Sequence, residues 1–148
     1  MKFLSTIQFL AITTLASPIT LKQTQTLEIQ NLSANHYSNV TLSNLQFTLH
    51  NPTINIIDNC NMSWNTSSEI QPGLAPQKCQ RGQFEFGFRY GIGDIERFTL
   101  VVQQVNGSAQ GSSVVSAYRR DPDWICLWNP VRGIQEHCVW NGILRVEV

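Results

Sequence analysis

Strict alternation of side-chain character is the feature of this sequence that most constrains its fold. From Gln83 to Tyr90, four aromatic rings take every second position, with polar or small residues between them. Successive side chains of a β-strand point to opposite faces, so a strand would gather these rings on one face, whereas a helix would scatter them. The segment is therefore predicted to be a half-buried strand whose core residues are Phe84, Phe86, Phe88 and Tyr90.

The same alternation recurs in other segments. Residues 91–94 interrupt the aromatic run and alternation then resumes, so residues 83–105 are predicted to form a hairpin. The dipeptide Asn106-Gly107 predicts a type I′ turn leading into a strand at 114–118. No stretch of a dozen residues has a helical period. The chain is therefore predicted to be all-β, a single antiparallel β-barrel or sandwich of roughly seven to nine strands. Its other strands are expected around 27–29, 45–49, 54–56 and 144–148.

The N-terminal residues have the layout of a secretory signal. Lys2 precedes an apolar stretch from Phe3 to Leu15, and small residues suit cleavage after Ala16. A membrane span needs about 20 predominantly apolar residues, and this stretch is shorter and interrupted by serine and threonine. A buried N-terminal helix is the alternative, but it would be short and poorly capped. The predicted organisation is a signal peptide at 1–16 and one extracellular domain at 17–148.

Charge gives no sign of a polyanionic partner. Ten lysines and arginines balance ten acidic residues, and charged residues make up only 14% of the chain. The one basic doublet, Arg119-Arg120, is followed at once by Asp121 and Asp123. A nucleic-acid or anionic-membrane footprint is therefore missing, and neither partner is predicted.

Export into an oxidising compartment makes the four cysteines disulfide candidates. Of the three possible pairings, Cys60 with Cys79 and Cys126 with Cys138 requires the least of the fold, because each bond closes a short loop. A four-cysteine metal site is the alternative, but there is no Cys-x-x-Cys knuckle and secretion disfavours free thiolates. Two local disulfides are predicted, and no metal or other cofactor.

Sugar attached during export is a further expectation. Five Asn-x-Ser/Thr triplets favour a secreted eukaryotic protein, and roughly half of them are expected to carry glycan. The glycosylation candidates are Asn31, Asn39, Asn61, Asn65 and Asn106.

A catalytic signature is missing. None of His36, His50 and His137 lies beside a serine or cysteine in a recognisable nucleophile motif. A pair of acids could serve a glycan hydrolase, but their separation in space decides that chemistry. Loop aspartates more often form turns, and the candidates for such a pair are Asp58, Asp94, Asp121 and Asp123. No catalytic residue is predicted, and an extracellular enzyme such as a glycan hydrolase is an alternative function.

The segment enclosed by the second cysteine pair offers better material for binding. Aromatic and arginine side chains on a loop held by a disulfide make good anchors for a partner. Trp124 and Trp140 are predicted to pack in the core beside the disulfide. Trp128 is predicted to be exposed, which makes Trp128 and Arg132 the candidate partner-binding residues. A hollow barrel would instead make the aromatic row a wall for a small apolar ligand.

Several features follow one another in a fixed order after the leader. They are an early β segment at 27–33, a strand from Leu45 and Phe47 to Cys60 and Trp64, Cys79 before the aromatic strand, and Trp124, Cys126 and Cys138 before the closing strand. This order resembles fungal secreted proteins related to the Alternaria major allergen, over most of the mature chain. The resemblance implies a compact β-barrel with two intramolecular disulfides, Cys60 with Cys79 and Cys126 with Cys138.

The same resemblance bears on partners. The allergen joins two subunits through a further cysteine near its mature N-terminus, and no cysteine here precedes Cys60, so no covalent dimer is predicted. The family includes secreted elicitors and candidate effectors, some linked to plant defence proteins or small phenolic ligands. It therefore implies a non-enzymatic extracellular effector, elicitor or allergen-like protein that binds a host protein. A carrier of a small apolar or phenolic ligand is an alternative.

Overall fold

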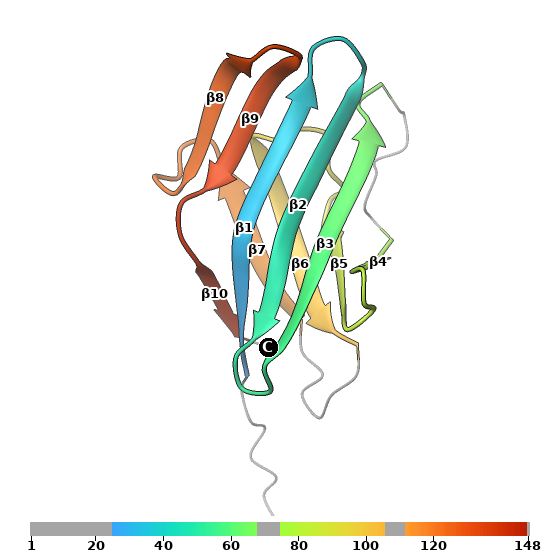
Figure 1. Ribbon diagram of the computed structural model, residues 1–148, viewed down its shortest axis with the longest axis vertical. Coiled ribbons are helices and arrows are strands. Elements are labelled where there is room, and N and C mark those ends of the chain that lie inside the picture. Colours follow the sequence, from blue (N-terminus) through green and yellow to red (C-terminus); the bar gives the residue numbers. More distant parts are fainter. Residues whose placement is uncertain (1–24, 68–74, 106–111, 148) are drawn as a thin grey trace, which may run out of the picture.

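The computed structural model describes residues 25–67, 75–105 and 112–147, which form two antiparallel β-sheets packed face to face (Figure 1). The strands are β1 (Thr26–Tyr37), β2 (Leu42–Asn51), β3 (Ile56–Asn65), β4 (Gln77–Lys78), β5 (Phe84–Phe88), β6 (Arg97–Gln104), β7 (Ser112–Tyr118), β8 (Trp124–Val131), β9 (Ile134–Trp140) and β10 (Leu144–Glu147). The predicted all-β class is confirmed. The sheets are not closed into a barrel. Of the two predicted architectures, a barrel or a sandwich, the structure has the sandwich. Among these residues no helix is long and apolar enough to cross a membrane.

Strand β1 is central to the larger sheet, whose order is β3-β2-β1-β9-β8. Residues 26–29 of β1 pair with β10 and residues 33–37 pair with β9, so two strands share one edge of β1. Between these halves the register with β2 shifts, and Asn31 has a φ of 54°. A bulge with a residue in the left-handed region bends a strand. This bend lies where β1 changes partner.

The smaller sheet has the order β4-β5-β6-β7. The hairpin predicted at 83–105 is β5 and β6, which pair from Phe84 with Gln104 to Phe88 with Leu100. The strand predicted at 114–118 lies within β7. The predicted leader at 1–16 and the predicted Asn106-Gly107 turn lie outside the described residues.

Edge-to-face aromatic contacts join the two sheets. Phe47 of β2 meets Phe86 of β5 with ring centroids 5.1 Å apart. Aromatic pairs prefer this geometry and gain about 1 kcal/mol beyond the area that they bury. The chain of contacts continues through Phe88, Phe98 and Trp124. These rings pack against one another in the space between the two sheets.

Tyr90 departs from the predicted core row. Phe84, Phe86 and Phe88 are buried as predicted, but Tyr90 is 69% exposed, so its assignment to the core was wrong. The physical reason is a turn that begins at the end of β5. The Gly91 amide donates to the Phe88 carbonyl at 3.1 Å, and Gly91 has a φ of 72°. Alternation therefore ends before Tyr90.

Both predicted disulfides form. Cys60–Cys79 joins β3 of the larger sheet to the residue after β4 of the smaller sheet, so it ties the two sheets together covalently. Cys126–Cys138 joins the neighbouring strands β8 and β9. All four cysteines of the chain are thus used within one molecule.

Buried Asp58 fixes the segment that follows β4. Its Oδ1 accepts the Arg81 amide at 2.9 Å and its Oδ2 accepts the Gln83 amide at 3.2 Å. The Gln80 amide also donates to the Asn59 carbonyl of β3 at 2.9 Å. Residues 79–83 therefore lie along the outer edge of β3 beside Asp58, Asn59 and Cys60, and they cover that part of the edge.

Removing this carboxylate tests the role of the covered edge. Asp58→Ala leaves two backbone amides without their acceptor, and hydrogen bonds to a charged group contribute about 1.5–3 kcal/mol each. We expect urea unfolding to show a loss of about 3 kcal/mol in the free energy of unfolding. Asn59→Ala, on the exposed face of the same strand, is the control and should change it by about 0.5 kcal/mol or less. Equal losses for both variants would contradict the prediction.

Candidate functional site

Exposed apolar side chains gather on β8, the outermost strand of the larger sheet (Figure 1). A strand with one buried face should show polar side chains on the other. Here the large exposed side chains are apolar. We call this set the β8 surface: Ile125 at 42% exposed, Leu127 at 52%, Trp128 at 52% and Val131 at 61%.

The tryptophans near the second disulfide differ in exposure in the way that the sequence predicts. Trp124 is 1% exposed, and Trp140 packs against the core while keeping part of its ring accessible. The Trp124 Nε1 donates to the Ile95 carbonyl at 3.2 Å, which holds the β5–β6 connection beneath β8. Trp128 is exposed, and Arg132 lies exposed in the turn that joins β8 to β9. Their partner-binding role stays a prediction.

Arg119 connects Trp128 to an acidic group. The guanidinium carbon of Arg119 lies 5.8 Å from the centre of the Trp128 ring. An Arg119 Nη1 also lies 3.0 Å from Oε1 of Glu96. A cation over an indole face is attracted by the ring and restricts how the ring moves. Arg119 therefore holds Trp128 in place from the β7 side.

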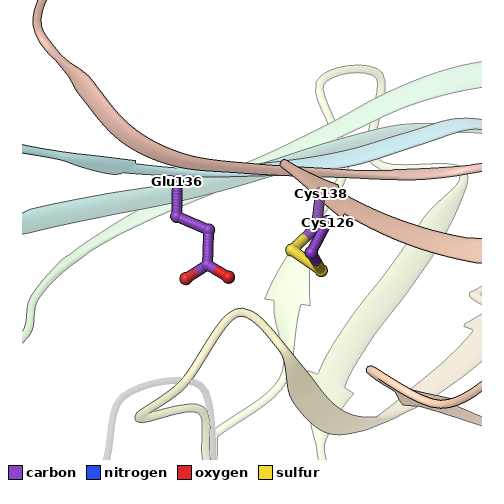
Figure 2. A group of neighbouring side chains, drawn as sticks. All are labelled: Cys126, Glu136 and Cys138. Atoms are coloured by element: carbon purple, nitrogen blue, oxygen red, sulfur yellow. A yellow bond between two sulfur atoms is a disulfide. The ribbon is translucent and has the colours of Figure 1, made fainter. Parts of the chain in front are cut away.

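Glu136 lies directly across from Trp128 in the β8–β9 register. Figure 2 shows its side chain on the same face of the hairpin as the Cys126–Cys138 disulfide. Glu136 is only 5% exposed, and its Oε1 has no hydrogen-bond partner among the described residues. A buried carboxyl group with an unpaired oxygen favours its neutral form.

The pKa of Glu136 is raised to about 8. Burial is the largest cause, and a hydrogen bond with Glu96 is the second. The negative charges of Glu96 and Asp94 act in the same direction, whereas Arg119 opposes them. A neutral Glu136 avoids repulsion from these nearby negative charges. Glu136 lies on β9 of the larger sheet, whereas Glu96 lies in the connection before β6 of the smaller sheet.

A small polar cavity adjoins this pair. It has a volume of about 190 Å³ and is lined by residues that include His36, Ser43, Asp94 and Glu136. The His36 Nδ1 and the Ser43 Oγ are hydrogen-bonded at 3.0 Å, but Ser43 is only 1% exposed. Its hydroxyl is therefore inaccessible to a substrate of any size.

The cysteines do not supply the metal site that was the alternative to two disulfides. Cys126, Glu136 and Cys138 bring three potential metal-binding atoms within 4.8 Å of one another. Both sulfur atoms are in a disulfide (Figure 2), so neither is available as the thiolate that a metal ion requires.

The other predicted acids have structural roles. Asp58 binds backbone amides, and the Oδ2 of Asp121 accepts the Tyr118 amide at 3.1 Å in the turn before β8. Asp94 accepts the Glu96 amide at 2.8 Å and also lines the cavity beside Glu136. Asp123 is exposed in the same turn as Asp121, and its carbonyl accepts the Asn141 amide at 2.8 Å.

Four glycosylation candidates lie on the β1–β3 side of the larger sheet. Asn31, Asn39, Asn61 and Asn65 are all exposed, whereas Asn106 lies outside the described residues. The Oδ1 of Asn65 accepts the Ser67 amide at 2.9 Å. Asn39 follows Ser38, whose amide donates to the Gly133 carbonyl in the β8–β9 turn at 3.2 Å, so Asn39 lies nearer to β8 than Asn61 and Asn65 on β3 do.

The comparisons with known proteins bear on the fold. No protein-family model matches the chain, and no curated protein matches its sequence. Among solved structures, the crystal structure of the Alternaria alternata allergen Alt a 1 matches over 90% of this chain and 95% of that chain, with a TM-score of 0.51. The two proteins share a fold. Their sequences are 14% identical, so the resemblance predicted from the order of cysteines and strands is confirmed for the fold alone.

Sequence reasoning missed Glu136, Glu96 and Arg119. One signal was available for Glu136, because it lies at the same alternate positions as Cys138 and Trp140 in the β9 segment. An acidic residue on the face that carries a cysteine and a tryptophan is predicted to be buried. Nothing in the sequence brings Glu96 and Arg119 to it.

The pH dependence of stability tests the buried acid. The pKa of Glu136 is about 8 in the folded protein against 4.5 for an ordinary glutamate. The folded state therefore keeps a proton that the unfolded chain loses, so stability is greatest below pH 4.5 and declines as the pH rises toward 8. One pKa unit corresponds to about 1.4 kcal/mol, so the decline is at most roughly 5 kcal/mol.

Glu136→Gln keeps the shape of the neutral acid at every pH. We expect the variant to flatten this decline and to be more stable than the wild type at about pH 8, as measured by urea unfolding across the range. Glu147→Gln, at an exposed position on β10, serves as the control and should retain the wild-type slope. Equal pH slopes for the wild type and Glu136→Gln would show that Glu136 is not protonated preferentially in the folded state.

Proposed function

We propose that this protein is a non-enzymatic extracellular protein of a fungus, acting as an effector or elicitor that binds a host protein through the β8 surface. The observation that carries the proposal is the set of four large apolar side chains exposed together on one edge strand. Single exposed apolar residues are ordinary, but here four lie within seven residues of one edge strand, with Ile125 and Leu127 on one face and Trp128 on the other.

The chemistry of the surface supports a protein partner. Tryptophan and arginine are the residues most enriched among those that dominate binding energy at protein interfaces. Trp128 is half exposed and is held by Arg119, which lowers the entropy that its ring would lose on binding. Arg132 adds an exposed cation next to Val131.

The extracellular setting is supported by two further observations. Both cysteine pairs are in disulfides, which persist in oxidising compartments. The fold is shared with an allergen of Alternaria alternata. We include in the proposal a signal peptide at 1–16 and glycan on some of the four exposed sequon asparagines.

The small-ligand alternative has less support. The aromatic row that would line a carrier cavity is packed edge to face and buried. The cavity beside Glu136, at about 190 Å³, is smaller than the roughly 300 Å³ at which ligand pockets begin. A larger surface cavity of about 620 Å³ is lined by six charged residues and Tyr118, which suits an apolar ligand poorly.

An oxidative-burst assay in leaf tissue tests the proposed function. We expect purified mature protein with intact disulfides to provoke a burst, and reduced and alkylated protein to provoke none, because the β8 surface depends on the fold. Trp128→Ala should weaken the response at least tenfold, since central aromatic residues contribute about 2 kcal/mol or more at interfaces.

Tyr90→Ala is the control, because Tyr90 is an exposed aromatic residue that is not part of β8. It should leave the response unchanged. A burst from the reduced protein, or equal responses from both alanine variants, would remove the β8 surface from the explanation. No burst from any form in several plant hosts would overturn the elicitor function.

A further inference from the structure

The two edge strands of the larger sheet, β3 and β8, differ in whether another segment covers them. The β3 edge is covered by residues 79–83, which are held by the Cys60–Cys79 disulfide, by Asp58 and by the hydrogen bond from Gln80 to Asn59. No such cover lies along β8. Among the described residues, Cys126 and Trp128 make no backbone hydrogen bond outside the pairing of β8 with β9.

The second disulfide shows which way the backbone of β8 faces. The Cα atoms of Cys126 and Cys138 are 4.0 Å apart. In an antiparallel pair, opposed residues this close belong to the non-hydrogen-bonded type, because hydrogen-bonded pairs are about 5.5 Å apart. The N–H and C=O groups of Cys126 therefore point away from β9, toward the open edge.

The same alternation applies two residues along. Trp128 is opposite Glu136 at the next non-hydrogen-bonded pair, so its N–H and C=O groups also face the open edge. At the other end, the Trp124 amide donates to the Asp121 carbonyl at 3.2 Å and is already used. The open edge thus presents the backbone groups of Cys126 and Trp128 in register.

The first five residues of β8 carry none of the usual edge protection. Proteins usually block an exposed edge with charged side chains, lysine above all, or with proline and bulges. In β8 the register shift and the proline come only after Trp128. Asn129, with a φ of 50°, and Pro130 follow at once and end the regular strand. The edge is therefore short, apolar and open.

We propose that β8 accepts an extended segment of the partner protein as an additional strand, bonded to the backbone of Cys126 and Trp128. Strand addition of this kind draws affinity from main-chain hydrogen bonds and specificity from alternate side chains. The inference rests on the β8 surface of the proposed function and names how that surface binds.

Charge decides what kind of segment fits. Two cations lie at the Trp128 end of the strand, Arg119 beside the ring and Arg132 in the following turn. Arg119 is shared with Glu96 but is 58% exposed. The complementary segment has apolar residues at alternate positions and an acidic residue at the end that meets these arginines. A second copy of β8 contains no acidic residue, so it lacks this complement.

A pair of synthetic peptides tests strand addition. The first alternates threonine and valine and ends in two glutamates. The second has the same sequence with N-methyl groups on the amides of one edge, which removes those donors but keeps the side chains. We expect the first peptide to bind and the second to bind at least tenfold more weakly, as measured by titration calorimetry.

Amide hydrogen exchange, followed by NMR, reports the register. In the free protein the amides of Cys126 and Trp128 should exchange rapidly, whereas those of Ile125 and Leu127, which face β9, should be protected. The first peptide should slow exchange at Cys126 and Trp128 at least tenfold. Leu127→Lys, or Ile125→Lys where the first variant does not fold, should abolish this protection. Gln46→Lys, at an exposed position on β2 of the same sheet, should retain this protection.

Three results would overturn the proposal: no binding of the first peptide, equal binding of both peptides, or protection of Cys126 and Trp128 in the free protein that grows with concentration. The last result would assign the edge to a second copy of the chain. The assay is independent of the leaf response. Peptide-dependent protection without a burst would retain strand addition and reject the elicitor function, whereas a burst that depends on Trp128 without protection would do the reverse.

Discussion

The contact between Phe47 and Phe86 is the interaction on which the two-sheet architecture depends. Neither sheet has a buried face by itself, because each is covered only by the other. The rings that meet across the gap remove apolar area from water at about 25 cal/mol per Å², and their edge-to-face arrangement fixes the separation at which the sheets pack. Every feature of the β8 region presupposes this spacing, since Glu136 reaches Glu96 only when the sheets are this close.

Much of this fold could be predicted from residues that are near one another in the sequence. Alternation from Gln83 to Phe88 predicts a strand because the period is a property of the local backbone, and the disulfide pairs followed from short loops. The prediction that Tyr90 lies in the core was wrong because the hydrogen bond from Gly91 to Phe88 ends the strand before the alternation in the sequence stops. The order of strands was beyond prediction, because the division of one β1 edge between β9 and β10 depends on contacts over a hundred residues apart.

Only part of the candidate site could be predicted from the sequence. Trp128 follows from its place in a loop rich in turn residues, and the structure exposes it. The acidic residues beneath it come from β9 and from the connection before β6, and Arg119 comes from the turn after β7. Long-range proximity of this kind leaves no trace in composition or spacing. The surface and the acid pair are nevertheless one unit, because Arg119 touches Trp128 on one side and Glu96 on the other.

The sharing of the β1 edge has a consequence for the order in which the molecule is made. Thr26 pairs with Glu147 and Ser33 pairs with Val139, so both halves of the central strand wait for residues more than a hundred positions later in the sequence. Until those residues are made, β1, β2 and β3 can form only a three-stranded meander with one edge of β1 unpaired. Pairings of such sequence separation make folding slow. The larger sheet is therefore completed only after β9 and β10 have been synthesised.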